Sequence, residues 1–180
     1  MKINKTFIEG LLIIEPQLFK DDRGFFYESY NKNNLDKVVN VVFVQDNESK
    51  SNKGVIRGLH FQKPPFEQTK LVRCVSGSIL DVAVDLRKNS KTYGKSFSIE
   101  LSSENNKQLF VPKGFAHGFQ VISDEAIVNY KVDNFYNSKS ESGIIWNDKD
   151  LSIDWNLDTK PVLSVKDLNL ISFKELKSPF

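Results

Sequence analysis

The feature that most constrains the fold of this chain is an alternation of apolar and polar residues with a period of two. In the segment SILDVAVDL, four aliphatic side chains fall on one face of an extended strand: Leu80, Val82, Val84 and Leu86. Asp81, Ala83 and Asp85 fall on the other face, and the segment KSFSIEL alternates in the same way. Because successive side chains of a β-strand point to opposite faces of a sheet, this pattern predicts strands.

Strand-like segments recur along the whole chain. Besides the two above, they cover residues 7–14, 24–29, 41–45, 55–61, 70–75, 108–111, 118–122 and 126–132. Turn signals rich in Gly, Pro, Ser or Asn separate them at 52–54, 76–78 and 112–114. Helix signals are confined to 33–39 and to a capping-box pattern, Ser164 with Asp167, that predicts a short C-terminal helix. We therefore expect an all-β fold, a cupin or jelly-roll β-sandwich barrel with an inner ligand cavity and a few short helices.

One domain accounts for the whole length. The chain has 180 residues, which suits a single hydrophobic core, and it contains no internal repeat, low-complexity tract or linker-like stretch. We expect a single domain over residues 1–180. The 25 basic and 23 acidic residues are interspersed and leave a net charge of +2, so the charge pattern indicates neither a nucleic-acid partner nor a membrane surface.

Cysteine usage and apolar runs bear on the compartment. Cys74 is the only cysteine, which excludes an intramolecular disulfide bond, and its place in the run LVRCV favours a small core residue over a nucleophile. The apolar run at 11–14 is bracketed by Glu9 and Glu15 and is too short for a secretory signal. No run approaches membrane-spanning length, and we expect a cytoplasmic location.

Three short motifs indicate a cupin whose metal site has been altered. PKGFAH, residues 112–117, has the Pro-x-Gly-x-x-His form of the second cupin motif. Lys70, separated by six residues from Gly77 of the first motif, stands where a metal-binding cupin has Glu, and His60-Phe61-Gln62 stands where it has His-x-His. Divalent metals need neutral imidazoles and carboxylates, and an ammonium group would repel them. We expect no metal and no cofactor, and a fixed cation that suits an anion or a developing oxyanion.

At these motifs the chain resembles the dTDP-4-dehydrorhamnose 3,5-epimerases, the RmlC-type cupins of bacterial deoxysugar biosynthesis. The resemblance runs in order through nearly the whole chain. It is carried by DDRGFFYES (21–29), VQDN (44–47), RGLHFQ (57–62), TKLVRC (69–74), LDVAVD (80–85), PKGFAHGF (112–119), NYKVDNFY (129–136), ESGIIWND (141–148) and SVKD (164–167).

The resemblance implies an acid–base mechanism on a nucleotide-linked 4-keto-6-deoxy sugar. The ketone acidifies the hydrogens at C3 and C5, and His60 would remove them, since a histidine has a pKa near working pH. Asp167 would orient His60, with Asp81 as the second choice for that role. Lys70 would stabilise the charge on O4 of the enolate, and Tyr130 would return the proton on the opposite face.

The resemblance also implies a set of binding residues and a partner. Arg23, Arg57 and His117 match pyrophosphate or sugar contacts, and guanidinium groups suit phosphate. The other expected contacts to nucleotide and sugar are Glu28, Gln45, Asp46, Asn47, Glu141 and Lys166. In this family Arg23 and Glu28 belong to an N-terminal strand that crosses to the neighbouring subunit, so a homodimer is implied.

Other interpretations of the same residues stay open at this point. His60 could be a core histidine, Lys70 a solvated edge lysine, Tyr130 plain core, and Asp167 only a helix cap. Relatives commonly have a proline shortly after the aromatic pair Phe135 and Tyr136, which this chain lacks.

The substrate and the reaction class also stay open. The identity of the base is open, and a GDP-linked 4-keto-heptose or inversion at C3 alone are alternatives. A sugar 3,4-ketoisomerase, a metal-dependent cupin and a non-catalytic nucleotide-sugar binding module are the competing functions.

Overall fold

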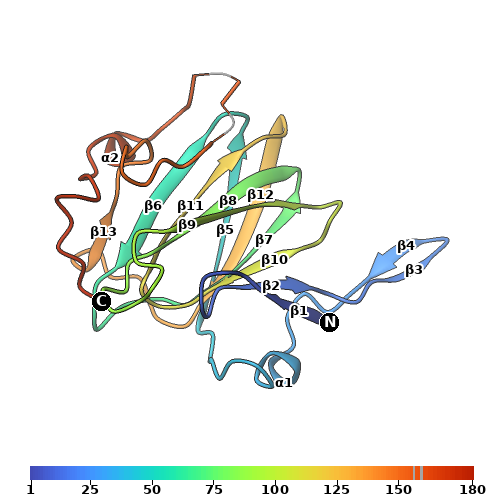
Figure 1. Ribbon diagram of the computed structural model, residues 1–180. Coiled ribbons are helices and arrows are strands. Elements are labelled where there is room, and N and C mark those ends of the chain that lie inside the picture. The colour runs from blue at the N-terminus through green and yellow to red at the C-terminus, as the bar shows by residue number, and fades with distance from the viewer. Residues whose placement is uncertain (156, 159) are drawn as a thin grey trace.

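The computed structural model describes residues 1–155, 157–158 and 160–180. Two antiparallel sheets face each other and make up most of it (Figure 1). In sheet order, the six-stranded sheet contains β1 Lys2–Lys5, β2 Leu12–Glu15, β10 Gln108–Val111, β7 Lys70–Ser76, β12 Glu125–Val132 and β5 Gln45–Asn52. The five-stranded sheet contains β13 Glu141–Gly143, β6 Ile56–Gln62, β11 Phe115–Val121, β8 Ser78–Asp85 and β9 Ser96–Ser102. The prediction of an all-β sandwich of the jelly-roll or cupin type is confirmed.

Three smaller elements lie outside the two sheets. A hairpin of β3 Phe19–Asp21 and β4 Gly24–Phe26 extends away from the sandwich on the right of Figure 1. The helices α1 Lys32–Leu35 and α2 Val165–Leu168 are single turns. Among the described residues, no helix is long and apolar enough to cross a membrane.

The main core lies between the two sheets. It draws Val72 and Val128 from the six-stranded sheet and Ile79 and Phe119 from the five-stranded sheet. Cys74 belongs to the same core and is 4% exposed, so its prediction as a small core residue is confirmed. Burial raises the pKa of its thiol to about 11, which keeps it protonated and unreactive.

Strand β8 is buried on both faces, because a second core covers the outside of the five-stranded sheet. Val82 and Val84 pack there against the C-terminal segment, which contributes Trp155 and Leu176. The opposite face of β8, which carries Asp81 and Ala83, therefore faces the interior of the sandwich. A buried carboxylate inside the barrel needs hydrogen-bond partners.

Several element boundaries differ from the sequence-based expectation. The segment 41–45 is not a strand, and β5 begins only at Gln45 and runs to Asn52. Its sequence, QDNESKSN, has no apolar residue, so hydrophobic alternation could not find it. Segment 7–14 forms a strand only from Leu12, and the helix expected at 33–39 is the single turn α1. The capping prediction is confirmed, because the Ser164 side chain accepts a hydrogen bond from the backbone N–H of Asp167.

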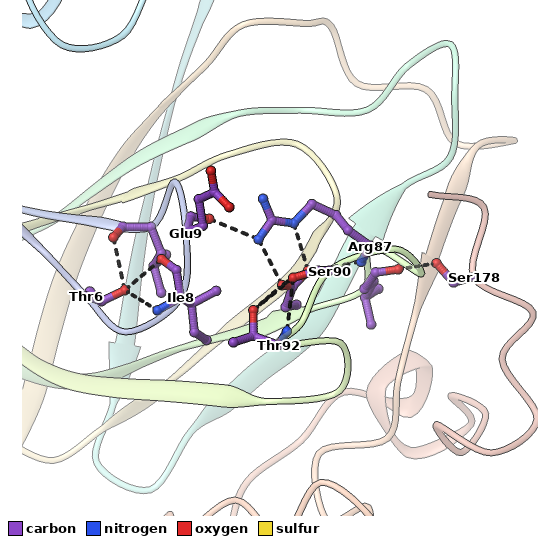
Figure 2. A network of polar contacts seen from close by, with 10 residues as sticks. Thr6, Ile8, Glu9, Arg87, Ser90, Thr92 and Ser178 are labelled. Atoms are coloured by element: carbon purple, nitrogen blue, oxygen red, sulfur yellow. Dashed lines mark hydrogen bonds and ion pairs between the residues drawn. The ribbon is translucent and has the colours of Figure 1, made fainter.

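A polar network connects the turn after β8 to the N-terminal loop, and Ser178 near the C-terminus donates a hydrogen bond to the backbone oxygen of Leu86 in the same region (Figure 2). Asp85 is fully buried and accepts hydrogen bonds from Nε and Nη2 of Arg87, from Ser90 Oγ and from Thr92 Oγ1, at 2.6–2.8 Å. Arg87 Nη2 also donates to the backbone oxygen of Glu9 in the N-terminal loop. Burial alone would raise the pKa of Asp85, but these donors lower it to about 2.

Candidate active site

Two adjoining hollows open between the sheets and share three residues, His60, Lys70 and Tyr130. The first hollow has a volume of about 460 Å³ and the second about 280 Å³. His60 comes from β6 of the five-stranded sheet, whereas Lys70 and Tyr130 come from β7 and β12 of the six-stranded sheet. The histidine and the tyrosine therefore approach the shared space from opposite walls.

His60 is held by a carboxylate from the far end of the chain. Its Nε2 lies 2.6 Å from Oδ1 of Asp167, while Oδ2 of Asp167 accepts a hydrogen bond of 2.7 Å from Ser164 Oγ. Burial acts to raise the pKa of Asp167, but the hydrogen bonds from His60 and Ser164 lower it overall, so the carboxylate is ionised. An ionised carboxylate only accepts, so Nε2 carries the proton and Nδ1 keeps the lone pair that a base requires.

Lys70 presents an uncommitted ammonium group to both hollows. Among the described residues it has no hydrogen-bond or ion-pair partner, and its Nζ lies 5.9 Å from the centre of the Tyr130 ring. Burial lowers the pKa of Lys70 to about 8, against the attraction of Asp81 and Glu141. The group is therefore largely charged at neutral pH, and its donors are free for an oxygen atom of a ligand.

Tyr130 lies on β12, on the wall opposite His60, and its phenol is a candidate proton donor. Burial raises the pKa of its phenol, Arg57 acts to lower it and Glu141 acts to raise it. A phenol with a raised pKa is protonated at neutral pH and can give up its proton only to a strong base such as a carbanion. The ring of Tyr130 also packs against the main core, as the alternative interpretation of the sequence expected. Packing of the ring leaves the hydroxyl group free to take part in chemistry.

The second histidine, His117, lies beside His60 on the neighbouring strand of the same sheet. His117 on β11 is the register partner of His60 on β6, and its Nε2 lies 2.9 Å from Oδ1 of Asp81. Asp81, the second choice for orienting the catalytic histidine, therefore holds the other histidine. Burial is the main cause that lowers the pKa of His117, and Lys70 and His60 act in the same direction.

A close approach of two strands sets the spacing of these histidines. The register between β6 and β11 shifts between His117 and Phe119. A Cβ atom on Gly58 would lie 2.6 Å from the Cα of Gly118 and 2.8 Å from the backbone oxygen of His117. Gly58 also has a φ of 120°, which favours glycine, so a side chain at this position would push the strands apart.

Six of the nine expected binding residues line the hollows, and His117, described above, is one of them. Arg57 and Lys166 border the first hollow, and Gln45, Asn47 and Glu141 border the second. Arg57 is oriented by Ser51, whose Oγ accepts a 3.0 Å hydrogen bond from Nε. Glu141 is paired with Lys166 and accepts a 2.7 Å hydrogen bond from the Tyr136 hydroxyl, and these contacts lower its pKa although burial acts to raise it.

Three expected binding residues lie elsewhere in this chain. Arg23 sits in the β3–β4 turn, paired with Asp21, and its side chain is 90% exposed. Glu28 accepts hydrogen bonds from the side chain of Asn31. Asp46 pairs with Lys131 at 2.9 Å on the opposite face of β5 from Gln45 and Asn47. None of the three borders either of the two hollows that contain His60, Lys70 and Tyr130.

Three serines around the hollows were not expected as site residues. Ser49 and Ser51 share the inner face of β5 with Gln45 and Asn47, and Ser164 was assigned only a capping role. The signal for the first two was present: uncharged polar residues alternate with charged ones from Gln45 to Ser51. Alternation of charged and uncharged polar residues can indicate a strand that lines a polar cavity, just as alternation of apolar and polar residues indicates a core strand.

The described residues contain no group of three or more His, Cys, Asp and Glu side chains that could hold a metal ion. The residues at the cupin-motif positions are instead two histidines, each hydrogen-bonded to an aspartate, and the Lys70 ammonium. This donor set fits proton transfer next to a developing negative charge.

Comparison with known proteins matches the chain over nearly its full length. The family model described as dTDP-4-dehydrorhamnose 3,5-epimerase matches residues 5–175. A protein of that name from Shigella flexneri is 54% identical over 171 residues, which cover 94% of this chain and 94% of the relative.

Solved structures give the same result. The crystal structure of dTDP-4-dehydrorhamnose 3,5-epimerase from Elizabethkingia anophelis NUHP1 superposes with a TM-score of 0.94 at 52% identity, covering 99% of this chain and 98% of the other. The dTDP-6-deoxy-D-glucose-3,5-epimerase RmlC from Legionella pneumophila Philadelphia 1, solved in complex with dTDP-4-keto-L-rhamnose, has a TM-score of 0.94 at 44% identity and covers 97% and 94%.

Proposed function

Because the chain belongs to the dTDP-4-dehydrorhamnose 3,5-epimerase family, we propose that its hollows carry out the epimerisation with His60, Lys70, Tyr130 and Asp167 as the reacting groups. The reaction converts a dTDP-linked 4-keto-6-deoxy-glucose into the 4-keto-L-rhamnose form by inverting C3 and C5. The observation that carries these assignments is the placement of a carboxylate-held histidine and a tyrosine on opposite walls, with an unpaired ammonium between the hollows.

In the first step, Nδ1 of His60 removes a proton from the carbon next to the ketone. Asp167 keeps the proton of neutral His60 on Nε2 and stabilises the imidazolium that forms. Ser164 holds the second oxygen of that carboxylate, which fixes the direction in which the histidine ring points.

The electrons of the broken C–H bond move onto the ketone oxygen and form an enolate. Lys70 is the cation that can meet this charge, because its donors have no other partner among the described residues. A single preorganised donor to an oxyanion is typically worth about 10²–10³ in rate. The partial burial that lowers the pKa of Lys70 also strengthens its attraction for the enolate.

In the second step, Tyr130 donates its proton to the opposite face of the same carbon. Inversion requires that the acid and the base approach from opposite sides, and the two sheets supply one each. His60 and Tyr130 then exchange protons with solvent and the cycle repeats at the second carbon. The same groups serve C3 and C5, since both carbons flank the one ketone.

The nucleotide end of the substrate fits the polar inner face of β5 and the region around Glu141. Gln45 and Asn47 are hydrogen-bonded to each other at 2.8 Å and border the second hollow with Tyr136. Amide groups can read the edge of a pyrimidine base, and an aromatic ring can stack on it. Arg57 borders the first hollow and suits the pyrophosphate.

A homodimer is part of the proposal because Arg23 and Glu28, two expected binding residues, lie away from both hollows of their own chain. The β3–β4 hairpin projects from the sandwich and carries Phe19, Phe25 and Phe26, which are 54–66% exposed (Figure 1). Large apolar side chains in a projecting hairpin favour docking on another protein surface. If the hairpin docks on a second copy, Arg23 brings a guanidinium group to the partner's hollow. Sedimentation of the purified protein should give a dimer, and Phe25→Asp with Phe26→Asp should give a monomer.

The reaction is tested by proton NMR in deuterated water, with dTDP-4-keto-6-deoxyglucose and a GDP-linked 4-keto sugar in parallel. Loss of both the C3 and the C5 signals of the thymidine substrate is the expected result. Loss at C3 alone would identify a 3-epimerase, and exchange only with the GDP sugar would change the substrate. Absence of exchange with either would favour a non-catalytic nucleotide-sugar binding module. We place the reaction in the cytoplasm, which cell fractionation would test.

A further inference from the structure

We propose that Asp81 is a positioning residue that holds His117 as a hydrogen-bond acceptor, so that Nδ1 of His117 accepts a hydrogen bond from a hydroxyl group of the bound sugar. The inference rests on the proposed function and deepens it, because it assigns His117 to the sugar and not to the pyrophosphate. It also gives a role to Asp81, which has none in the proton transfers.

The geometry of the pair fixes which ring nitrogen is occupied. Nε2 of His117 lies 2.9 Å from Oδ1 of Asp81, whose side chain is fully buried. The other oxygen, Oδ2, is also buried and has no hydrogen-bond partner among the described residues. A proton on Oδ2 would have no acceptor there, and a proton on Oδ1 would remove the negative charge that attracts the neighbouring ammonium of Lys70, so the carboxylate form fits the site better. A carboxylate only accepts, and Nε2 must therefore donate.

The surroundings of His117 keep the ring neutral. Lys70 on β7 and His60 on β6 face it as actual or potential cations, and in the described part of the chain Asp81 on β8 is the one carboxylate hydrogen-bonded to it. Burial is the largest effect and lowers the pKa of His117, which outweighs the attraction of Asp81. A neutral ring with its proton on Nε2 carries a lone pair on Nδ1.

That lone pair is available to a ligand. His117 borders the first hollow, and Nδ1 has no hydrogen-bond partner in the described part of the chain, nor is it among the sealed, unpartnered side-chain atoms there. An unprotonated nitrogen repels phosphate oxygens but accepts readily from a hydroxyl group. The sugar of a nucleotide-linked 4-keto sugar carries such hydroxyl groups next to the reacting carbons, and Arg57 remains for the phosphates.

The tautomer can be observed directly, because the chain has only two histidines. Long-range ¹H–¹⁵N spectra of protein labelled with ¹⁵N-histidine, assigned with a His60→Asn variant, report the protonation of each ring nitrogen. We expect His117 to have protonated Nε2 and unprotonated Nδ1 at neutral pH. A protonated Nδ1 in the unmutated protein would overturn the proposal, whatever happens to any variant.

The ligand contact is tested with Asp81→Asn and two ligands. An amide nitrogen facing Nε2 moves the ring proton to Nδ1 and makes His117 a donor, so KM for the dTDP-4-keto sugar should rise about tenfold. The affinity for dTDP, which has the pyrophosphate but no 4-keto sugar, should stay within about twofold in a titration calorimeter. Equal weakening of both ligands, or of neither, would contradict the assignment. Measurement at about pH 6.5, well below the Lys70 pKa of about 8, keeps Lys70 charged in both proteins.

Asp85→Asn is the matched control. Asp85 lies on the same strand and the same face, is equally buried, and binds Arg87, Ser90 and Thr92 at a distance from the hollows. It should lower stability without changing KM or the His117 tautomer. Failure of the epimerase assignment itself would appear separately, as absence of deuterium exchange in the unmutated protein.

Discussion

Oδ1 of Asp167 lies 2.6 Å from Nε2 of His60, although 107 residues separate the two in the chain. The contact joins the one-turn helix α2 to β6 and, in the proposed mechanism, prepares a half-buried histidine to act as the general base. The other oxygen of Asp167, Oδ2, accepts a hydrogen bond from Ser164, so the N-cap residue of α2 also helps to hold the carboxylate that contacts His60.

His60→Ala should abolish deuterium exchange at both C3 and C5. Removal of a general base typically costs about 10²–10⁴ in rate, and Tyr130 cannot replace it because its pKa is raised. The measurement is the loss of the two substrate signals by proton NMR. Exchange at one carbon that survives in the variant would mean that a different base serves that carbon.

Ser164→Ala should slow turnover without abolishing it. The variant loses the hydrogen bond that holds Asp167 Oδ2 and the N-cap of α2, so we expect a kcat lowered about tenfold and about 1 kcal/mol less stability. Ser164→Thr keeps the hydroxyl and should restore most of both. An alanine variant with unchanged kcat but reduced stability would reduce Ser164 to a helix cap.

Activity should fall as the pH rises through about 8, because Lys70 with its pKa of about 8 loses its charge there. Below that pH the lysine is protonated, which is its active form. The fall of kcat/KM on the basic side therefore reports the deprotonation of Lys70 in the free enzyme. Lys70→Met should lower kcat by about 10²–10³. The control is Lys50→Met, which removes an exposed lysine paired with Glu125. A basic limb that persists in Lys70→Met would assign the limb to another group.

Tyr130→Phe should separate the two halves of the reaction. Proton removal by His60 does not need the phenol, so exchange of substrate hydrogens should continue, whereas formation of the inverted product should fall by about 10²-fold or more. Product configuration is read from the NMR coupling constants. Tyr93→Phe, which changes a tyrosine packed on Phe173 outside both hollows, is the control. Full turnover in Tyr130→Phe would mean that another group is the acid.

Asp85 should make stability depend on acid pH. Its folded pKa of about 2 lies below the unfolded value, so its contribution is present above the unfolded pKa and is lost as the pH falls through the folded one. We expect about 2 kcal/mol of unfolding free energy to disappear between about pH 5 and pH 2. Urea unfolding across this range, compared with Asp85→Asn, isolates the contribution. Parallel curves for the two proteins would show that other carboxylates are responsible.

The strands and the cupin-like fold follow from local pattern, but the partners of the site residues do not. Hydrophobic alternation identified β8 and β9, whereas the strand expected at 118–122 begins at Phe115 and includes His117. No local pattern connects His60 with Asp167, and that pair came from the resemblance. The same resemblance could not say that Asp81 holds His117, because the pairing depends on which face of β8 turns inward.

The pleat of a strand separates side chains that are neighbours in the sequence. Gln45, Asp46 and Asn47 were each expected as contacts to the nucleotide or the sugar, and in this chain Asp46 points to the other face of β5 and pairs with Lys131. Likewise, Arg23 and Glu28 lie in or next to a projecting hairpin and cannot be placed from one chain. Sequence similarity assigned these residues to a site, whereas geometry decides whether one chain can bring them there.

The alternation along β5 also separates two kinds of change that the protein can accept. Odd-numbered residues from Gln45 to Ser51 face the hollows or hold a residue that does, while the intervening even-numbered ones are exposed. Substrate preference can therefore diverge at the odd positions while the outer surface diverges at the even ones. A library restricted to Gln45, Asn47 and Ser49 would sample new nucleotide sugars without disturbing the exterior, which makes this one strand a natural starting point for redesign.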